Sequence, residues 1–176
     1  MSKIITADGM VDLDTYGLPA TIDNFLPEEE FQALIKYITD ANFPWYRGYK
    51  VKDSNEPPQI QLRHVFKHPK YGVSNNYEGF TPIEAKFNKV VKAKINLTFS
   101  SGKHKLGGWH YDYDKKSANT LAILYLNDNN GFTLLEDGTQ LHSKANRLAL
   151  FDNVSHTDVT QTDTEERIVL NIGFIK

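Results

Sequence analysis

The sequence predicts a mainly β protein with two supporting α-helices. After residue 94 the apolar residues recur with a period of two, as they do in strands that bury one face. Turn signals separate these segments, whereas two earlier segments carry apolar residues at helical spacing. Many short strands at regular spacing are typical of a sandwich or a barrel. We therefore expect two helices packed against a β-rich C-terminal half.

The chain has 176 residues, a length that suits one domain with a substantial core. Hydrophobic residues make up 40% and charged residues 24%, close to ordinary globular usage. We expect a single domain over residues 1–176. Within it, residues 1–18 should be loosely attached, residues 19–93 should form a cap of helices and loops, and residues 94–176 should form the core barrel.

Charge and cysteine usage narrow the class of protein. The net charge of -2 gives no electrostatic case for binding nucleic acid, so nucleic acid is not expected as a partner. The chain has no cysteine, which excludes disulfides, thiolate nucleophiles and cysteine-type zinc sites. Its first residues form neither a secretory signal nor a membrane anchor. We therefore expect a cytoplasmic protein with no membrane partner.

The first predicted helix starts near Pro27, which suits a first helical position and precedes three glutamates that complement the helix dipole. Four apolar residues follow at i, i+3, i+4 and i+7: Phe31, Leu34, Ile35 and Ile38. Asn42 and Pro44 should end this helix. Residues 45–80 are rich in proline, glycine and aromatic residues, and there we expect one or two strands around residues 59–66 between long loops.

A second helix is predicted from Thr81, because Thr81 and Glu84 form a capping box. Its apolar face would carry Ile83, Phe87, Val90 and Val91. The candidate strands after it are residues 94–99, 106–112, 118–126, 131–135, 147–151, 155–160 and 166–175.

The chemistry centres on His110 and Asp112. In a strand, residues i and i+2 point to the same face, so an imidazole and a carboxylate would project together. These are two of the three ligands of a facial metal triad, and His156 is the best candidate for the third. The spacing alone is weak, because a solvated loop explains it equally well and residues 156–158 repeat it.

The last apolar strand adds a second polar group. Alternation places Arg167 and Asn171 on one face of an otherwise apolar strand, where a guanidinium needs a partner. A bound dicarboxylate would satisfy it, since arginine matches carboxylates bidentately. Pairing with Glu165 or Glu166, or simple solvation, is the alternative.

The ordered set His110-x-Asp112, His156 and Arg167 resembles the 2-oxoglutarate- and Fe(II)-dependent oxygenase superfamily. The likeness is strongest to the prolyl-4-hydroxylase-like branch, which includes phage-encoded members. Flanking segments that resemble this branch cover most of residues 20–176, and they are residues 23–27, 43–46, 124–128, 146–152 and 167–174.

This resemblance implies a double-stranded β-helix, a jelly-roll or cupin-like barrel, that hydroxylates a C–H bond with O2. It assigns Fe(II) to His110, Asp112 and His156 as the catalytic centre. It assigns the far carboxylate of 2-oxoglutarate, the cosubstrate, to Arg167, with Tyr125 as a further hydrogen-bond donor. Ascorbate is an additional candidate cofactor.

Three departures from the branch stand out. Phe99 replaces a tyrosine that some relatives use toward the cosubstrate, so Asn96, Thr98 or Asn171 would supply that hydrogen bond. Residues 130–133 replace a glycine pair, and the gap from His156 to Arg167 is slightly long. We expect the aromatic-rich residues 45–80 to face the substrate, and one of Trp109, Tyr111 and Tyr113 to line the mouth of the site.

The resemblance makes a prolyl or other side chain of a protein or peptide the leading substrate. A small metabolite or a nucleobase stays open, although the nucleic-acid-repair branch carries a second arginine that the last strand lacks. A non-catalytic binding barrel is the other alternative, but all three ligands and the arginine are present. His64 and His68 also lie at metal-pair spacing. Pro69 follows them in a strand-like segment, so we expect a structural or surface pair.

Overall fold

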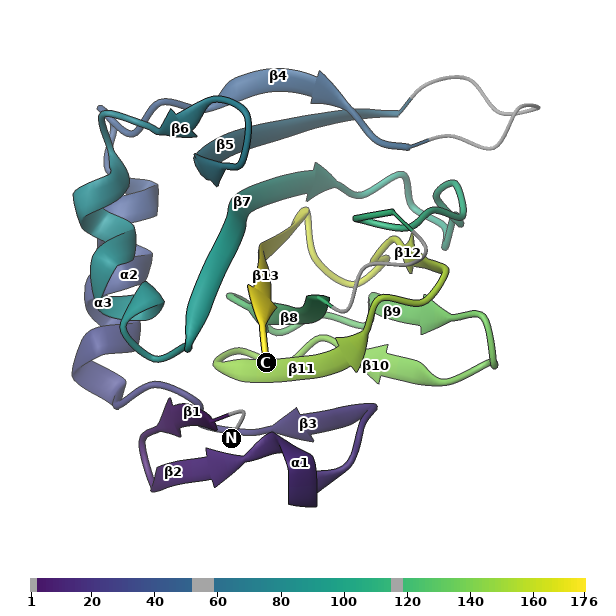
Figure 1. The fold of residues 1–176 in the computed structure, drawn as a ribbon. Helices are drawn as coiled ribbons and strands as arrows, with labels where there is room; N and C mark the ends of the chain where they lie inside the picture. The colour runs from purple at the N-terminus through teal and green to yellow at the C-terminus, as the bar shows by residue number, and fades with distance from the viewer. Residues whose placement is uncertain (1–2, 52–58, 115–118) are drawn as a thin grey trace.

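The computed structural model describes residues 3–51, 59–114 and 119–176, and most of its regular structure is β (Figure 1). The largest sheet has eight strands, seven of them in a continuous antiparallel order, with β6 (Gly72–Val73) paired to β5. The order is β3 (Ala20–Ile22), β11 (Arg147–Asp152), β8 (Asn119–Tyr125), β13 (Glu166–Ile175), β7 (Lys89–Phe99), β5 (Ile60–His68) and β4 (Tyr46–Tyr49).

A second sheet of three antiparallel strands faces it, in the order β10 (Gln140–His142), β9 (Phe132–Leu135) and β12 (His156–Val159). The two sheets share a buried apolar cluster. Leu121, Ile123 and Phe151 of the large sheet meet Leu135 and Leu141 of the small one. Alternation along β8 and β13 directs every second side chain into this interior. The predicted β-rich C-terminal half is therefore a barrel made of two facing sheets.

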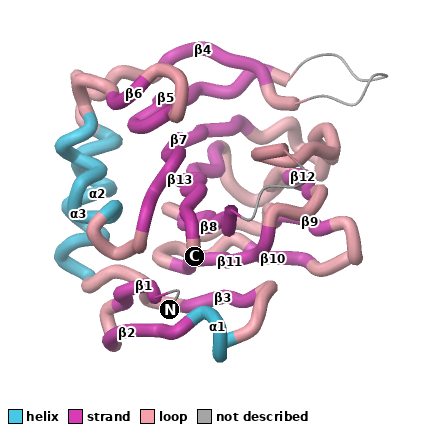
Figure 2. The backbone as a smooth tube through the Cα atoms, in the orientation of Figure 1, coloured by secondary structure: helices cyan, strands magenta, loops and turns pink. Residues whose placement is uncertain are grey.

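The opposite face of the large sheet carries the main core. Helix α2 (Glu28–Thr39) buries Phe31, Leu34 and Ile38 in this core, which also contains Leu124 and Leu170 of the sheet. Figure 2 shows α2 together with α3 (Thr81–Glu84) on this side. The first helix is thus confirmed, with Pro27 as its N-cap and its end at Thr39, before the predicted stop.

The second predicted helix was too long. The chain forms a 3-10 turn (Tyr77–Phe80) and a single α-helical turn, α3 (Thr81–Glu84), before it enters β7. Val90 lies in β7 opposite Phe174 of β13. β-branched residues lose rotamer freedom in helices and pack well in sheets, so strand pairing prevails over the helical spacing here.

The loosely attached N-terminal segment is another expectation that the structure contradicts. Residues 3–16 form the hairpin β1 (Lys3–Thr6) and β2 (Gly9–Asp12) and the short helix α1 (Leu13–Tyr16). Ile4 is fully buried, and the Ile5 amide donates to the Lys86 carbonyl at 2.9 Å. These contacts come from residues far along the chain, so local periodicity gave no sign of them.

Most predicted strands are confirmed by β5, β7, β8, β9, β11, β12 and β13. The predicted strand over residues 106–112 is wrong. This segment makes only isolated bridges, from Leu106 to Val159 and from His110 to His156. The short strands β1–β4, β6 and β10 carried no clear pattern in the sequence. Within the three described stretches, no helix is long and apolar enough to cross a membrane.

Asn146 joins the N-terminal cap to the barrel. Its backbone is left-handed at φ +59°, and its side chain is buried. The side-chain oxygen accepts from the Leu26 amide at 2.9 Å, and its amide nitrogen donates to the Leu26 carbonyl at 2.8 Å. Its backbone carbonyl also accepts from the Phe25 amide at 2.9 Å. One residue thus satisfies both backbone groups of Leu26, 120 residues away in sequence.

Replacing Asn146 by alanine should lower the free energy of unfolding by about 2–4 kcal/mol, because two buried backbone groups lose their partners and alanine is less tolerant of the left-handed conformation. Urea unfolding followed by circular dichroism measures the change. The control Asn88→Ala, at an exposed asparagine, should stay within about 0.5 kcal/mol of the parent. Equal stability of the two variants would contradict this account of Asn146.

Candidate metal and cosubstrate site

Reciprocal backbone hydrogen bonds join the two histidines of the candidate metal site. The His110 amide donates to the His156 carbonyl and the His156 amide donates to the His110 carbonyl, each at 3.0 Å. His156 opens β12, while His110 lies in the irregular segment after β7. Gly107 donates to the Asp158 carbonyl at 2.8 Å, and a side chain at Gly107 would collide with the Asp158 carboxylate. This glycine therefore allows the loop to approach β12 closely.

The ring nitrogens of both histidines are oriented by backbone carbonyls. His110 Nδ1 lies 2.8 Å from the Gly108 oxygen, and His156 Nδ1 lies 3.0 Å from the Val154 oxygen. Because a carbonyl only accepts, each Nδ1 must carry the hydrogen. Each Nε2 then keeps a free lone pair, as in most histidine metal ligands.

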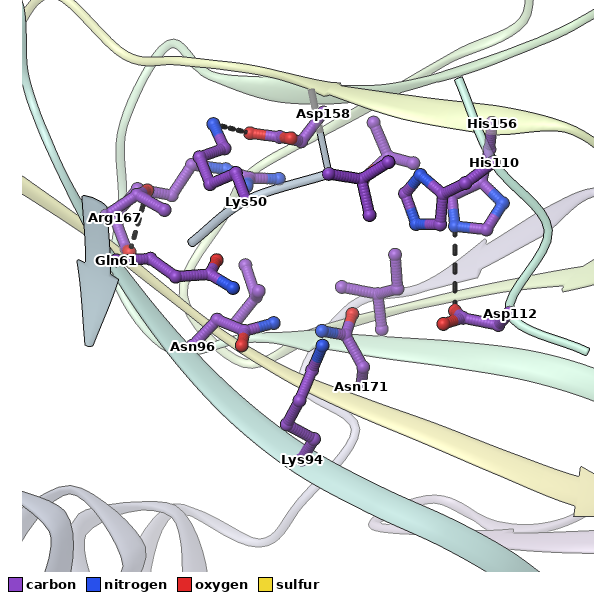
Figure 3. Close-up of a pocket in the computed structure, with 15 residues that line it drawn as sticks. Lys50, Gln61, Lys94, Asn96, His110, Asp112, His156, Asp158, Arg167 and Asn171 are labelled. Carbon is purple, nitrogen blue, oxygen red and sulfur yellow. Dashed lines mark hydrogen bonds and ion pairs between the residues drawn. The ribbon is translucent and has the colours of Figure 1, made fainter. Parts of the chain in front are cut away.

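The third group completes the cluster (Figure 3). His156 Nε2 lies 3.6 Å from Asp112 Oδ2, and one ligand atom from each of His110, Asp112 and His156 lies within 4.8 Å of the others. Two imidazoles and one carboxylate are the donor set of facial-triad Fe(II) sites, which leave coordination positions open. The side chains therefore fit a mononuclear transition-metal ion.

The local charges favour the ionisation states that a metal requires. Burial alone would raise the pKa of Asp112, but the neighbouring His156 side chain and the cations of Lys92 and Lys94 bring the pKa below its usual value. Lys92 Nζ lies 3.2 Å from Asp112 Oδ1. Burial lowers the pKa of His110. Near neutral pH the site thus presents a carboxylate and a neutral imidazole, and a cation can bind without first displacing protons from them.

Arg167 faces the same cavity from β13, and it is 3% exposed. Its Nε donates to Ser143 Oγ at 3.0 Å, while its Nη2 is buried with no hydrogen-bond partner among the described residues. Neither Glu165 nor Glu166 pairs with it. An unsatisfied charged N–H inside a protein costs about 1–3 kcal/mol or more, so the cavity should hold a ligand that accepts this hydrogen bond. A carboxylate is the natural acceptor.

The other residues assigned to the cosubstrate divide into two groups. Asn96 and Asn171 line the cavity, and the Asn96 side-chain oxygen is also buried without a partner. Tyr125 does not line it. The Tyr125 hydroxyl donates to the Leu141 carbonyl at 2.7 Å, and its ring lies 5.4 Å below the Arg167 guanidinium carbon. In this geometry Tyr125 supports Arg167, and its hydroxyl oxygen also lies 3.0 Å from Oγ1 of Thr133, which lines the cavity.

Five further polar residues line the cavity and were not predicted: Lys50, Gln61, Lys94, Thr133 and Asp158. Lys50 and Asp158 form an ion pair across the cavity roof. Lys94 shares a strand face with Asn96, so alternation over residues 94–99 carried a signal for it. Lys50 follows β4 in a loop, where no periodicity could have singled it out.

Trp109, Tyr111 and Tyr113 do not line the cavity itself. Tyr113 packs against Gly173 and lines a smaller hollow that shares Asp112, Ile123 and Asn171 with the cavity, so an aromatic residue at the mouth stays a prediction. His64 is buried, with its ring nitrogens 2.9 Å from the Pro44 carbonyl and from Ser74 Oγ, and His68 stacks on Tyr71. The His64 and His68 side chains are therefore structural or surface groups, as expected.

We compared the sequence and the structure with known proteins. The sequence matches no protein-family model and no curated protein. Among solved structures it is similar to a Pseudomonas putida prolyl-4-hydroxylase, with 17% identity, a TM-score of 0.57, and coverage of 89% of this chain and 92% of the other. A prolyl hydroxylase from Trichoplax adhaerens, in complex with a hypoxia inducible factor peptide fragment, matches with 11% identity, a TM-score of 0.60, and coverage of 92% and 85%.

A third structure is the non-haem α-ketoglutarate-dependent epimerase SnoN from nogalamycin biosynthesis. It matches with 11% identity and a TM-score of 0.63, over 89% of this chain and 78% of the other. At this level of identity the likeness describes the fold. The two facing sheets form a double-stranded β-helix of the kind found in 2-oxoglutarate- and Fe(II)-dependent oxygenases.

Removing the carboxylate of Asp112 should weaken metal binding by about 100-fold or more, since loss of a second-sphere partner alone typically costs 10–100-fold. Co(II) is a suitable probe because its visible spectrum reports coordination directly. The control Asp8→Ala, at an exposed carboxylate, should bind Co(II) like the parent. Undiminished Co(II) affinity in Asp112→Ala would remove Asp112 from the ligand set.

Proposed function

We propose that this protein is an Fe(II)- and 2-oxoglutarate-dependent dioxygenase that hydroxylates a C–H bond. The observation that carries the proposal is the pairing of two sites in one cavity. His110, Asp112 and His156 converge at one end with both Nε2 atoms free, and Arg167 presents an unsatisfied guanidinium in the same cavity. A metal and an anionic cosubstrate would together occupy both sites.

Each side chain then has a physical task. His110, Asp112 and His156 would hold the metal on one face, and Arg167 would bind the far carboxylate of the cosubstrate and fix its direction. Asn96 and Asn171 would offer hydrogen bonds along the cavity wall, while Ile123 and Val169 exclude water there. When bound, Fe(II), 2-oxoglutarate and O2 would supply an oxidant strong enough to attack an unactivated C–H bond.

We infer a peptide or protein side chain as the leading substrate, with proline first. Two of the similar structures are prolyl hydroxylases, which supports this choice. SnoN is an epimerase on the same fold, so a small metabolite stays an alternative, as does a nucleobase. We further propose that residues 1–176 act as one domain in the cytoplasm, of phage type as the sequence resemblance indicates, with ascorbate as an accessory reductant.

Two features of the site favour an enzyme over a binding barrel that lacks turnover. A protein that only binds a ligand has no need to hold the Nε2 atoms of two histidines free beside the carboxylate of Asp112, whose pKa is lowered. The buried Nη2 of Arg167, which has no hydrogen-bond partner among the described residues, likewise points to an anionic ligand within the barrel. These features are costly for a purely structural interior.

Anaerobic addition of Fe(II) and 2-oxoglutarate should produce a weak visible charge-transfer band, because the cosubstrate chelates the metal. Admission of air should then yield succinate in amounts that exceed a no-protein control. Asp112→Ala should show neither signal, and Asp8→Ala should show both. A parent protein without band and without succinate would refute the dioxygenase proposal and leave the binding barrel.

Arg167→Met should raise the concentration of 2-oxoglutarate needed for half-maximal band intensity by about 10–100-fold, because a charge-assisted hydrogen bond of about 1.5–3 kcal/mol is lost. Co(II) affinity should be unchanged, since Arg167 is not among the metal-site residues. Arg47→Met, at an exposed arginine, is the matched control. Unaltered dependence on 2-oxoglutarate would show that another cation anchors it.

A further inference from the structure

A second hollow adjoins the metal cavity on the same side of the large sheet. Lys94 lines both, so the two are continuous at that residue. The second hollow runs from β7 across β5 to β6, at the upper edge of the sheet in Figure 1. We call it the basic groove, and the side chains that define its character are Arg63, His68, Tyr71, Val73, Lys92 and Lys94.

Lys94 is the pivotal residue of this groove. Its register partners are Asn171 of β13 and Val65 of β5, so its side chain shares a sheet face with the cavity polar groups. In Figure 3 its ammonium group lies beside Asn171 and between Asn96 and Asp112. Within the described stretches Lys94 makes no hydrogen bond or ion pair, and burial lowers its pKa. A largely desolvated cation without a partner gains most from an anionic ligand.

The rest of the groove has matching character. Arg63 is exposed and, in the described part of the chain, has no ion-pair partner. Lys92 adds a third positive charge, which it shares with Asp112. Tyr71 and Val73 are 74% and 55% exposed, and form an apolar wall. No aspartate or glutamate among the described residues lines this hollow.

We propose that the basic groove binds an acidic segment of a peptide substrate, with Lys94 paired to a carboxylate next to the side chain that is oxidised. This inference rests on the proposed function, because it assigns the substrate of the same site. The charges of Lys94 and Arg63 require an anionic occupant. The exposed wall of Tyr71 and Val73, which lies away from the metal, requires an occupant long enough to reach it.

The arrangement also separates two anions. Arg167 lies on β13 opposite Thr98, while Lys94 lies opposite Asn171, four residues further along both strands. The cosubstrate carboxylate at Arg167 and a substrate carboxylate at Lys94 can therefore be held at once. A lysine or arginine at the corresponding substrate position would meet Lys94 and Arg63 and be repelled. Lys94 is thus a specificity-determining residue that selects acidic over basic peptides.

The test uses fluorescently labelled short peptides with a central proline flanked by glutamate, glutamine or lysine. Fluorescence anisotropy measures their binding to the full chain loaded with Mn(II) and 2-oxoglutarate, which does not turn over. The glutamate peptide should bind about tenfold more tightly than the glutamine peptide. The lysine peptide should bind more weakly than either. The preference should shrink as salt rises from about 0.05 to about 0.5 M.

Variants locate the binding surface. Lys94→Gln should weaken binding of the glutamate peptide about tenfold and should change binding of the glutamine peptide little. Arg63→Gln should weaken it about threefold because this arginine is exposed, and Arg63→Glu should remove the preference for the glutamate peptide. Lys36→Gln removes an exposed positive charge from α2 on the opposite side of the sheet, so it should bind the peptides like the parent.

Equal binding of the three peptides would overturn this proposal, as would unchanged affinities in both Lys94→Gln and Arg63→Glu. Tighter binding of a labelled single-stranded oligonucleotide than of the glutamate peptide would assign the groove to nucleic acid instead. The proposed function is tested separately, because the charge-transfer band and succinate need no peptide. A band with no peptide preference rejects only the groove assignment, whereas a missing band rejects the dioxygenase itself.

Discussion

The reciprocal backbone hydrogen bonds between His110 and His156 are the constraint on which the site depends. They join an irregular loop to a strand of the small sheet, and Gly107 lets the two come close enough to bond. Backbone carbonyls two residues away then set the orientation of each imidazole. Main-chain contacts therefore fix the positions of the two imidazoles in advance, so binding of the proposed metal would cost little ordering entropy.

One sheet performs two tasks because its strands alternate. On β7 and β13 one face supplies Ile95, Leu170 and Ile172 to the core beneath α2. The other face presents Asn96, Arg167 and Asn171 to the cavity. Strand pairing holds both faces in one register, so the polar groups are as rigid as the core behind them. The proposed substrate groove extends this polar face onto β5, which belongs to the same sheet.

Periodicity and end signals predicted α2 and the long strands, because those elements bury one face over many residues. The sequence could not predict where local preference yields to distant partners. Val90 was predicted in a helix but lies in a strand, where it pairs with Phe174. Ile4 is buried because its hairpin packs on residues far along the chain. The candidate ligands were found through spacing and order, although His110 and Asp112 do not lie in the strand that the spacing assumed. Lys50 and Asp158 come together only in the folded chain, so no pattern in the sequence predicted their ion pair.

The buried groups left without partners have a thermodynamic consequence. Arg167 Nη2 and Asn96 Oδ1 are buried, and neither has a hydrogen-bond partner among the described residues. Their desolvation lowers the stability of the empty barrel, and any ligand that satisfies them restores that stability by mass action, since it binds the native state alone. With the proposed metal and cosubstrate bound, the protein would therefore be more resistant to unfolding and proteolysis, and its lifetime in a cell would follow their supply.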